Sequence, residues 1–329
     1  MQTSTNHILG ESPVKSLPGV CWLLPAGVLL CLYPGVTSVG ALLAGVALGL
    51  SGGNTMPAKT HQAAHVMLQI SVIGLGAGMN LQTILRAGLD GLGITVVSIS
   101  LTLAAGLWFG RKLGVSRDLT LLISGGTAIC GGSAIAALSG AMRPQAHDTA
   151  VALAVVFLLN GVALLVFPPV GHLLGLTQIQ FGWWAALGIH DTSSVTGAGL
   201  AYGGEALALA TVIKLTRALW IAPLVFIVAR FFRSSADTEN QKSQLQFPWF
   251  IAGFIGLAAL CTWLPAMATV TPLLKITSQR LLVVTLFLIG AGFSRPALRA
   301  VGLKPFALAV ALWIFVAGGA LIGVVLGFR

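Results

Sequence analysis

The chain is built from long, continuous runs of apolar residues separated by short polar or glycine-containing turns. A helix needs about 20 apolar residues to cross a bilayer, and these runs do not alternate between apolar and polar residues as the strands of a membrane barrel do. The pattern therefore predicts an all-α polytopic membrane protein. Runs of roughly spanning length lie at 17–33, 36–52, 65–82, 88–110, 149–170, 205–232, 247–265, 279–294 and 304–327.

Two further apolar segments, 117–140 and 180–203, are interrupted at their centres by small and polar residues. The interruption is SGGTAICGGS (Ser124–Ser133) in the first segment and GIHDTSS (Gly188–Ser194) in the second. The chain makes eleven passes if both segments cross the membrane, and nine if both are re-entrant hairpins. Lys and Arg collect on the cytoplasmic side of membrane proteins. In both topologies this rule places the amino end in the cytoplasm and the carboxyl end outside.

The sequence predicts a polar N-terminal tail followed by one membrane domain. We expect a cytoplasmic tail over residues 1–16 without a signal-peptide cleavage site, followed by a single transmembrane transporter domain over 17–329. The two halves of that domain are joined near 171–180 or near 234–246, the second being the markedly polar stretch that contains SSADTENQKSQ.

An internal echo links the two halves. IGLGAGMNLQTILRAGLDGLG (Ile73–Gly93) resembles LFLIGAGFSRPALRAVGLKPF (Leu286–Phe306), since each ends one span in Gly-Ala-Gly and opens the next after Leu-Arg-Ala. The predicted topology points the copies in opposite directions, as inverted repeats do in secondary transporters. The alternative is a chance recurrence in a chain with 41 glycines. A simple tandem repeat does not fit, because the interrupted segment follows the first copy but precedes the second.

Composition agrees with a membrane location and excludes several functions. Hydrophobic residues make up 56% of the chain, charged residues 8%, and the mean hydropathy is +0.94, which leaves too little polar surface for a soluble globule. The net charge of +10 comes from Lys and Arg at the ends of apolar runs, so we expect no nucleic-acid binding. The cysteines show no CxxC spacing, and no Walker or HExxH motif occurs. We therefore expect no enzyme activity, no cofactor and no metal.

Three ionisable residues lie inside apolar runs. Asp191 is the only one of eight acidic residues well inside such a run, and Lys214 and Arg217 follow on one helical face. Ionisable groups are costly at bilayer depth and are kept where a pathway or site uses them. Two bases against one acid leave a surplus positive charge. Lys214 and Arg217 therefore form either a structural ion pair with Asp191 or a cationic clamp on an anionic substrate.

The two interruptions predict a binding site in the middle of the membrane. Open backbone in hydrocarbon must be buried in protein or line an aqueous cavity, and the half-helix that follows each break presents free N–H groups and a positive dipole end to an anion. We predict Asp191 and His190 as ligands of the coupling ion. The predicted substrate-binding residues are Gly126, Thr127, Cys130, Gly131, Gly132, Ser133, Thr192, Ser193, Ser194, Lys214 and Arg217.

Each of these assignments has a structural alternative. The glycines of the first break can serve helix packing instead of a ligand. His190 is either a proton carrier or a neutral packing group, and Asn160 is either a hydrogen bond between helices or a ligand.

Three motifs resemble those of a known family. GTAICGGSAIAA (Gly126–Ala137), GIHDTSSVTGAG (Gly188–Gly199) and VIKLTRALW (Val212–Trp220) resemble the bacterial YeiH-type family of sulfate exporters, and the resemblance covers nearly the whole chain. It implies a distant relation to the cation/proton antiporter and anion transporter superfamily, with inverted repeats and a core domain that holds two broken elements. It also implies that sulfate or a related sulfur oxyanion is the exported substrate.

Together, these observations predict an inner-membrane secondary transporter for a small inorganic or organic anion, coupled to a proton or Na⁺. A cation/proton antiporter that uses Asp191 and a passive anion channel are the alternatives. The lipid bilayer is an expected partner, and a homodimer is left open.

Overall fold

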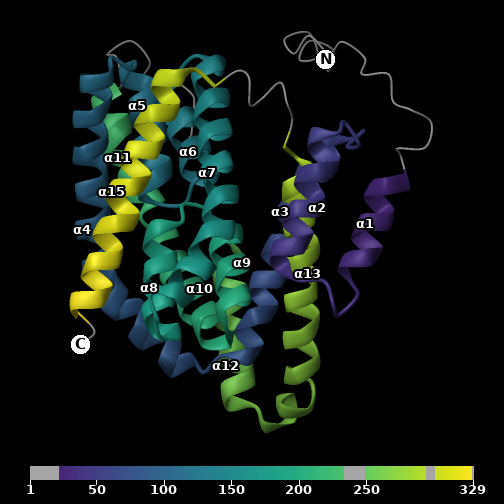
Figure 1. The fold of residues 1–329 in the computed structure, drawn as a ribbon. Coiled ribbons are helices and arrows are strands. Elements are labelled where there is room, and N and C mark those ends of the chain that lie inside the picture. The colour runs from purple at the N-terminus through teal and green to yellow at the C-terminus, as the bar shows by residue number, and fades with distance from the viewer. Residues whose placement is uncertain (1–21, 233–248, 294–300, 328–329) are drawn as a thin grey trace, which may run out of the picture.

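The computed structural model describes residues 22–232, 249–293 and 301–327. The predicted tail at 1–16 and the connection at 234–246 lie outside these described residues. Within them the chain is helical and has no strand (Figure 1). The α-helices are α1 (Leu23–Cys31), α2 (Ser38–Leu50), α3 (Pro57–Leu75), α4 (Leu81–Leu113), α5 (Arg117–Ala128), α6 (Gly132–Met142), α7 (Ala146–Leu173), α8 (Gln178–Gly188), α9 (Thr192–Tyr202), α10 (Gly204–Ala218), α11 (Ile221–Phe232), α12 (Trp249–Trp263), α13 (Thr271–Ala291) and α15 (Leu303–Gly327).

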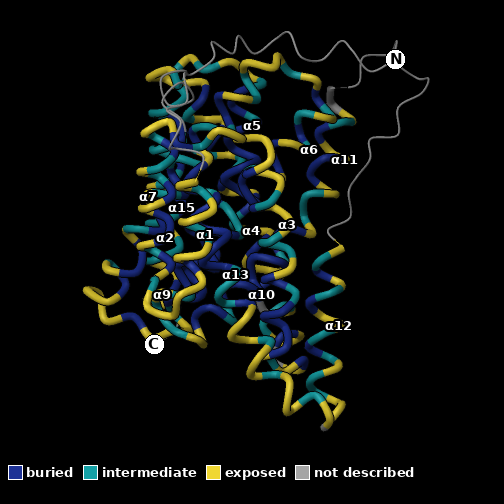
Figure 2. The backbone as a smooth tube through the Cα atoms, turned by 90° about the vertical axis from the view of Figure 1, so that its right-hand side faces the viewer, coloured by how far each residue is buried: buried dark blue, intermediate teal, exposed yellow. Residues whose placement is uncertain are grey.

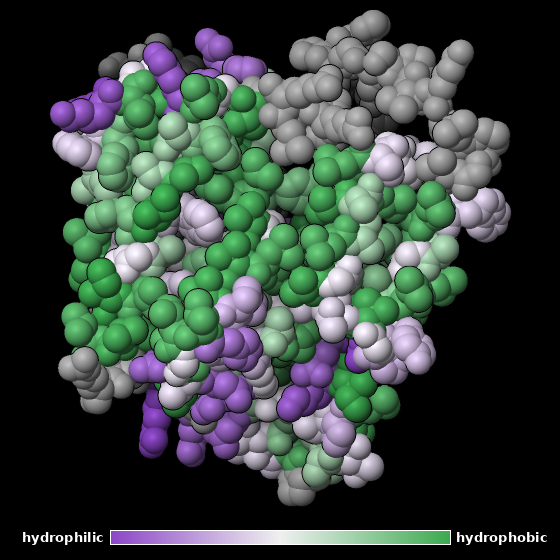
Figure 3. All heavy atoms as spheres, viewed as in Figure 1, coloured by the Kyte–Doolittle hydropathy of each residue, from purple (hydrophilic) through white to green (hydrophobic). Residues whose placement is uncertain are grey.

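The helices have the length and surface of a membrane protein. Five stretches of the described chain are long and apolar enough to cross a bilayer: Ile84–Leu113, Ala146–Leu173, Gly204–Arg230, Thr271–Ala291 and Leu303–Gly327. Figure 3 shows a broad hydrophobic belt on the visible face, with hydrophilic side chains gathered above and below it. The all-α membrane fold is therefore confirmed.

The first interrupted segment is a hairpin. A Cβ added at Gly125 of α5 would touch Leu138 of α6, and one added at Gly126 would touch Ile135, so the two helices run back along each other. Each half is short: the 12 residues of α5 extend about 18 Å, roughly half of a bilayer. The segment therefore reaches the middle of the protein and returns to the face at which it entered.

The second interrupted segment is also a hairpin. Phe181 near the start of α8 stacks on Tyr202 at the end of α9 with 3.7 Å between ring centroids. The Tyr202 hydroxyl donates to the Leu176 carbonyl at 2.5 Å, just before α8 begins. Because the long helix α7 connects the two hairpins, they enter from opposite faces and their turns meet at mid-height (Figure 1). This geometry favours nine passes over eleven.

The two copies of the internal echo run in opposite directions. Gly74 of α3 lies against Ser278 of α13, whereas Gly78 just beyond α3 lies against Lys275, so α3 and α13 are antiparallel. The helices α4 and α15 also pair antiparallel, with Gly106 against Leu312 and Gly114 against Lys304. An inverted repeat requires this arrangement. Residues 294–300, which hold Arg295 and Arg299 of the second copy, lie outside the described part.

The second hairpin packs through α9 against α2 and α13. The backbones of α2 and α13 lie so close that a Cβ at Gly45 or Gly290 would overlap the opposite main chain. Contact with the second hairpin includes a hydrogen bond from the Ser38 hydroxyl to the Gly197 carbonyl at 3.3 Å. In Figure 2 the buried residues run through the centre of the bundle, and all residues from Phe181 to His190 are buried.

Candidate functional site

The turns of the two hairpins touch each other. Gly131 precedes α6 with φ +65°, a left-handed conformation that favours glycine. A Cβ added at Gly131 would lie 3.5 Å from both Cα and Cβ of Asp191, which precedes α9. The structure therefore brings the two predicted breaks together in the interior, where each shelters the open backbone of the other.

Asp191 caps the second half-helix of its hairpin. Its carboxylate accepts a hydrogen bond from the Ser193 amide at 3.1 Å and another from the Ser193 hydroxyl. This is the N-cap arrangement, in which a side chain satisfies an amide that has no partner within the helix. Asp191 and Thr192 are half-buried, whereas Ser193 and Ser194 are buried. The accessible polar groups of this hairpin are therefore at its turn.

The helix that follows the first break, α6, has no side-chain cap. Its N-cap residue is Gly131, which has no side chain to accept a hydrogen bond. Ser133 is exposed and Gly132 is half-buried, so this helix end is open on one side. Thr127, on the other side of the break, is fully buried and its hydroxyl has no partner among the described residues.

The carbonyl end of α8 is closed by side-chain donors. Four carbonyls at a helix C-terminus have no partner within the helix. Lys214 donates to the Ile189 carbonyl at 2.6 Å, and Arg217 donates to those of Ala186 and Leu187 at 2.9 Å each. The Gly188 carbonyl accepts from the indole N–H of Trp313 at 3.1 Å. Every carbonyl from 186 to 189 is thereby satisfied.

Arg217 also reaches the other hairpin. Its second terminal nitrogen donates to the carbonyl of Ala128, the last residue of α5. Arg217 and Lys214 are both 0% exposed, and no ion pair joins either one to Asp191 within the described residues. The cations thus serve the two negative helix ends, a role that the sequence did not suggest.

Counting charges at the turns leaves a positive balance. A helix end carries about half a unit charge, positive at the N-terminus and negative at the C-terminus. The C-termini of α5 and α8 and the N-termini of α6 and α9 therefore cancel approximately. Lys214 and Arg217 then outweigh Asp191 by one positive charge. No side chain caps the amides at the start of α6. The site can therefore accept an anion beside these amides.

Asn160 of α7 fixes the second turn in place. Its side-chain oxygen accepts from the amides of His190 at 3.0 Å and Asp191 at 3.2 Å, so the hydrogen bond between helices is the alternative that the structure supports. The Asn160 amide nitrogen and both ring nitrogens of His190 are buried and have no partner among the described residues. The Asn160 nitrogen is a donor, and a neutral His190 ring offers one donor and one acceptor, so these buried groups can bond a ligand or water that enters beside them.

Seven of the thirteen predicted site residues divide into two groups. Gly131, Gly132, Ser133, Asp191 and Thr192 lie at the touching turns, whereas Lys214 and Arg217 lie behind them on the carbonyl ends. Sequence reasoning missed Trp313. An indole N–H in an apolar run needs a partner, but one sequence does not show which carbonyl receives it.

Comparison with known proteins agrees with this fold. The model of a family described as conserved hypothetical protein 698 matches residues 27–309. The chain belongs to this family. A UPF0324 membrane protein of Bdellovibrio bacteriovorus is 49% identical over 304 residues, which is 92% of this chain and 94% of the relative. UPF0324 membrane proteins of Geobacter sulfurreducens and Bacteroides thetaiotaomicron are 46% and 44% identical, covering 87% and 85% of this chain and 90% and 84% of the relatives.

The family membership confirms a multi-pass membrane protein of bacterial type. The names of these UPF0324 relatives give a membrane location and no substrate. Sulfate export, implied by the resemblance of the motifs, stays a prediction.

Proposed function

We propose that the chain is a secondary transporter that binds a small anion where its two re-entrant hairpins meet. The observation that supports this proposal is that the buried cations bind the carbonyl ends of the broken helices and not the amide ends. Lys214 and Arg217 neutralise the carbonyl ends of α8 and α5, and Asp191 caps α9, so that the amide end of α6 is left to face a ligand. A helix N-terminus in an environment of net positive charge favours the binding of an anion.

Sulfate or a related sulfur oxyanion fits the donors at this place. Such an anion offers several acceptor oxygens, and the nearby donors are uncharged groups: the open amides of α6, the Ser133 hydroxyl, and the unpartnered nitrogens of Asn160 and His190. Neutral donors around an anion, with the cations one layer behind, allow release as well as binding, since no ion pair must be broken. The motif resemblance supports the same substrate class.

Asp191 and His190 are the groups suited to coupling. Asp191 is half-buried at the contact between the hairpins, and its neighbour His190 is 1% exposed with a ring that has no partner among the described residues. A proton on Asp191 changes the balance of charge at the turns by one unit. Anion binding and proton binding would then be linked, as symport requires.

The proposed orientation places the α5–α6 hairpin on the cytoplasmic side. Lys112, Arg117, Arg143 and Lys304 lie at that end of the bundle, and the positive-inside rule assigns such an end to the cytoplasm. The amino end is then cytoplasmic, and the carboxyl end lies outside the inner membrane.

Flux into proteoliposomes tests the proposal. Purified protein is reconstituted and uptake of labelled sulfate, sulfite and phosphate is measured with and without a pH gradient. Saturable oxyanion uptake that responds to the gradient supports the proposal. Uptake driven only by sodium or potassium exchange would replace it with a cation/proton antiporter that uses Asp191, and a conductance far above transporter turnover would indicate a passive anion channel.

A further inference from the structure

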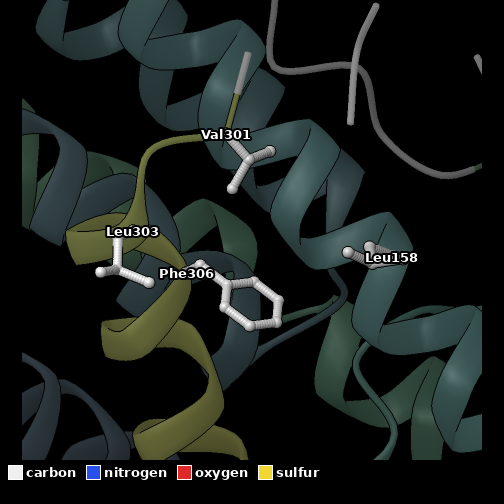
Figure 4. Close-up of a pocket in the computed structure, with 4 residues that line it drawn as sticks. All are labelled: Leu158, Val301, Leu303 and Phe306. Carbon is white, nitrogen blue, oxygen red and sulfur yellow. The ribbon is translucent and has the colours of Figure 1, made fainter. Parts of the chain in front are cut away.

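Two cavities lined by described residues differ in character. One, of about 370 Å³, lies between α7 and the start of α15 and is lined by Leu158, Val301, Leu303 and Phe306, all of them apolar (Figure 4). The other, of about 580 Å³, lies between α4, α8 and α10, and its lining includes the opposite charges of Arg86 and Glu205. Only the second cavity can recognise a charged molecule.

Arg86 and Glu205 line one cavity without pairing with each other. No hydrogen bond or ion pair of either side chain occurs within the described residues; the Glu205 backbone amide alone is bonded, to the Gln178 side chain. A cation and an anion that face one cavity unpaired form a receptor for a molecule that carries both charges. An isolated anion or cation would satisfy only one of them.

The rest of the cavity is apolar and opens towards lipid. Its other lining residues include Ile94, Ile179, Trp183, Leu209 and Val212. Ile94 and Ile179 are themselves 44% and 43% exposed on the membrane-facing surface. A soluble zwitterion such as an amino acid would gain little from these walls, whereas acyl chains would cover them.

The charges stand at the depth of a lipid headgroup. Glu205 is in the first turn of α10 and Arg86 in the second turn of α4, and both helices begin at the face from which the α8–α9 hairpin enters. A headgroup lies at this level of a bilayer, about 15 Å from its midplane. Arginine is well suited to a phosphate group, and a carboxylate to a primary ammonium.

We propose that this cavity is a binding site for a zwitterionic phospholipid with a primary ammonium headgroup. Its phosphate contacts Arg86, its ammonium donates to Glu205, and an acyl chain lies along Trp183 and Ile94. The site is separate from the hairpin turns and does not depend on the transported substrate.

Lipid titration of the delipidated, detergent-purified protein tests the proposal. Phosphatidylethanolamine should raise the unfolding midpoint more than phosphatidylglycerol or phosphatidylcholine, because only it supplies both a phosphate and a primary ammonium. Native mass spectrometry should show at least a threefold preference for it. Glu205→Gln should remove that preference, and Arg86→Gln should weaken binding of all three lipids. Lys275→Gln, which removes an exposed cation outside the cavity, is the matched control.

Three results would overturn the proposal. These are equal binding of the three lipids, a preference that survives Glu205→Gln, and equal stabilisation by soluble phosphoethanolamine, which would identify a free zwitterion as the ligand. If a charge variant unfolds, Ala208→Phe provides a second test of lipid binding, because it fills the cavity and keeps both charges. It should lose the bound lipid, and retention of the lipid would place it elsewhere.

Discussion

The side-chain oxygen of Asn160 holds the backbone amide of Asp191 at 3.2 Å, and it accepts a second hydrogen bond from His190. One acceptor on α7 thus satisfies two adjacent amides at the turn of the second hairpin. Each amide would cost roughly 1–3 kcal/mol if left buried without a partner. This contact connects the position of Asp191 to the central helix of the bundle.

Asn160→Ala and Asn160→Asp should therefore behave differently. Asn160→Ala removes the acceptor and should destabilise the protein by about 2–6 kcal/mol from two unpaired amides. Asn160→Asp keeps an acceptor but adds a negative charge, so it should fold while oxyanion affinity falls at least tenfold. Thermal unfolding and equilibrium binding of labelled sulfate measure the two effects. Equal affinity of Asn160→Asp and the parent protein would argue against a positively balanced site.

Asp191→Asn should separate capping from coupling. An asparagine side chain also caps a helix N-terminus, so the variant should fold with its hairpin intact and bind substrate. Transport should no longer respond to a pH gradient, because the titrating group is gone. Flux into proteoliposomes at several gradients measures this, with Asp148→Asn in the first turn of α7 as the control. A variant that loses stability but keeps normal coupling would show that Asp191 has a structural role only.

Arg217→Gln should destabilise the empty protein more than Lys214→Gln does. Arg217 bonds three carbonyls in the two hairpins, whereas Lys214 has a short bond to Ile189 and a longer one, of 3.4 Å, to Ala186, which Arg217 also bonds. Each orphaned carbonyl costs roughly 1–3 kcal/mol. Unfolding midpoints in detergent, with and without sulfate, measure the loss. If Arg217→Gln unfolds like the parent while losing all stabilisation by sulfate, the guanidinium binds the anion directly.

Gly131→Ala should be harmful although it adds only one methyl group. The φ of +65° costs an alanine about 1–2 kcal/mol, and this strain falls where the turn meets Asp191, which the new Cβ would touch at an ordinary contact distance of 3.5 Å. Gly140→Ala in α6 is the matched control, because its Cβ would meet nothing within 4 Å and alanine favours a helix by about 0.5–1 kcal/mol. Transport rate and unfolding midpoint should fall for the first variant only. A Gly131→Ala protein with normal transport would show that the turns need not touch.

The two hairpins can be tested by cysteine labelling from either side of the membrane. Val115→Cys and Gln145→Cys flank the first hairpin, and Leu174→Cys and Gly204→Cys flank the second. In a background without native cysteines, both members of a pair should react with an impermeant maleimide from one side, the first pair from the cytoplasm. Members of one pair that react from opposite sides would restore the eleven-pass topology.

The sequence alone was enough to find the two breaks and to expect them to meet. Glycines and hydroxyl residues in the middle of an apolar run weaken a helix at bilayer depth, where its open backbone needs shelter, and an isolated Asp191 is costly in hydrocarbon. The partners of Lys214 and Arg217 could not be predicted. A helix C-terminus attracts a buried cation as an anionic ligand does, and spacing along one helix does not show which of them it faces.

A single guanidinium fastened to the ends of both α5 and α8 has a mechanical consequence. The two hairpins cannot separate without breaking the hydrogen bonds of a buried guanidinium. We therefore expect them to move as one unit. An opening that alternates between the two sides of the membrane would then arise by sliding of this joined unit along α2 and α13. That contact includes a hydrogen bond from Ser38 to Gly197, and Gly197 also lies against Leu286 of α13.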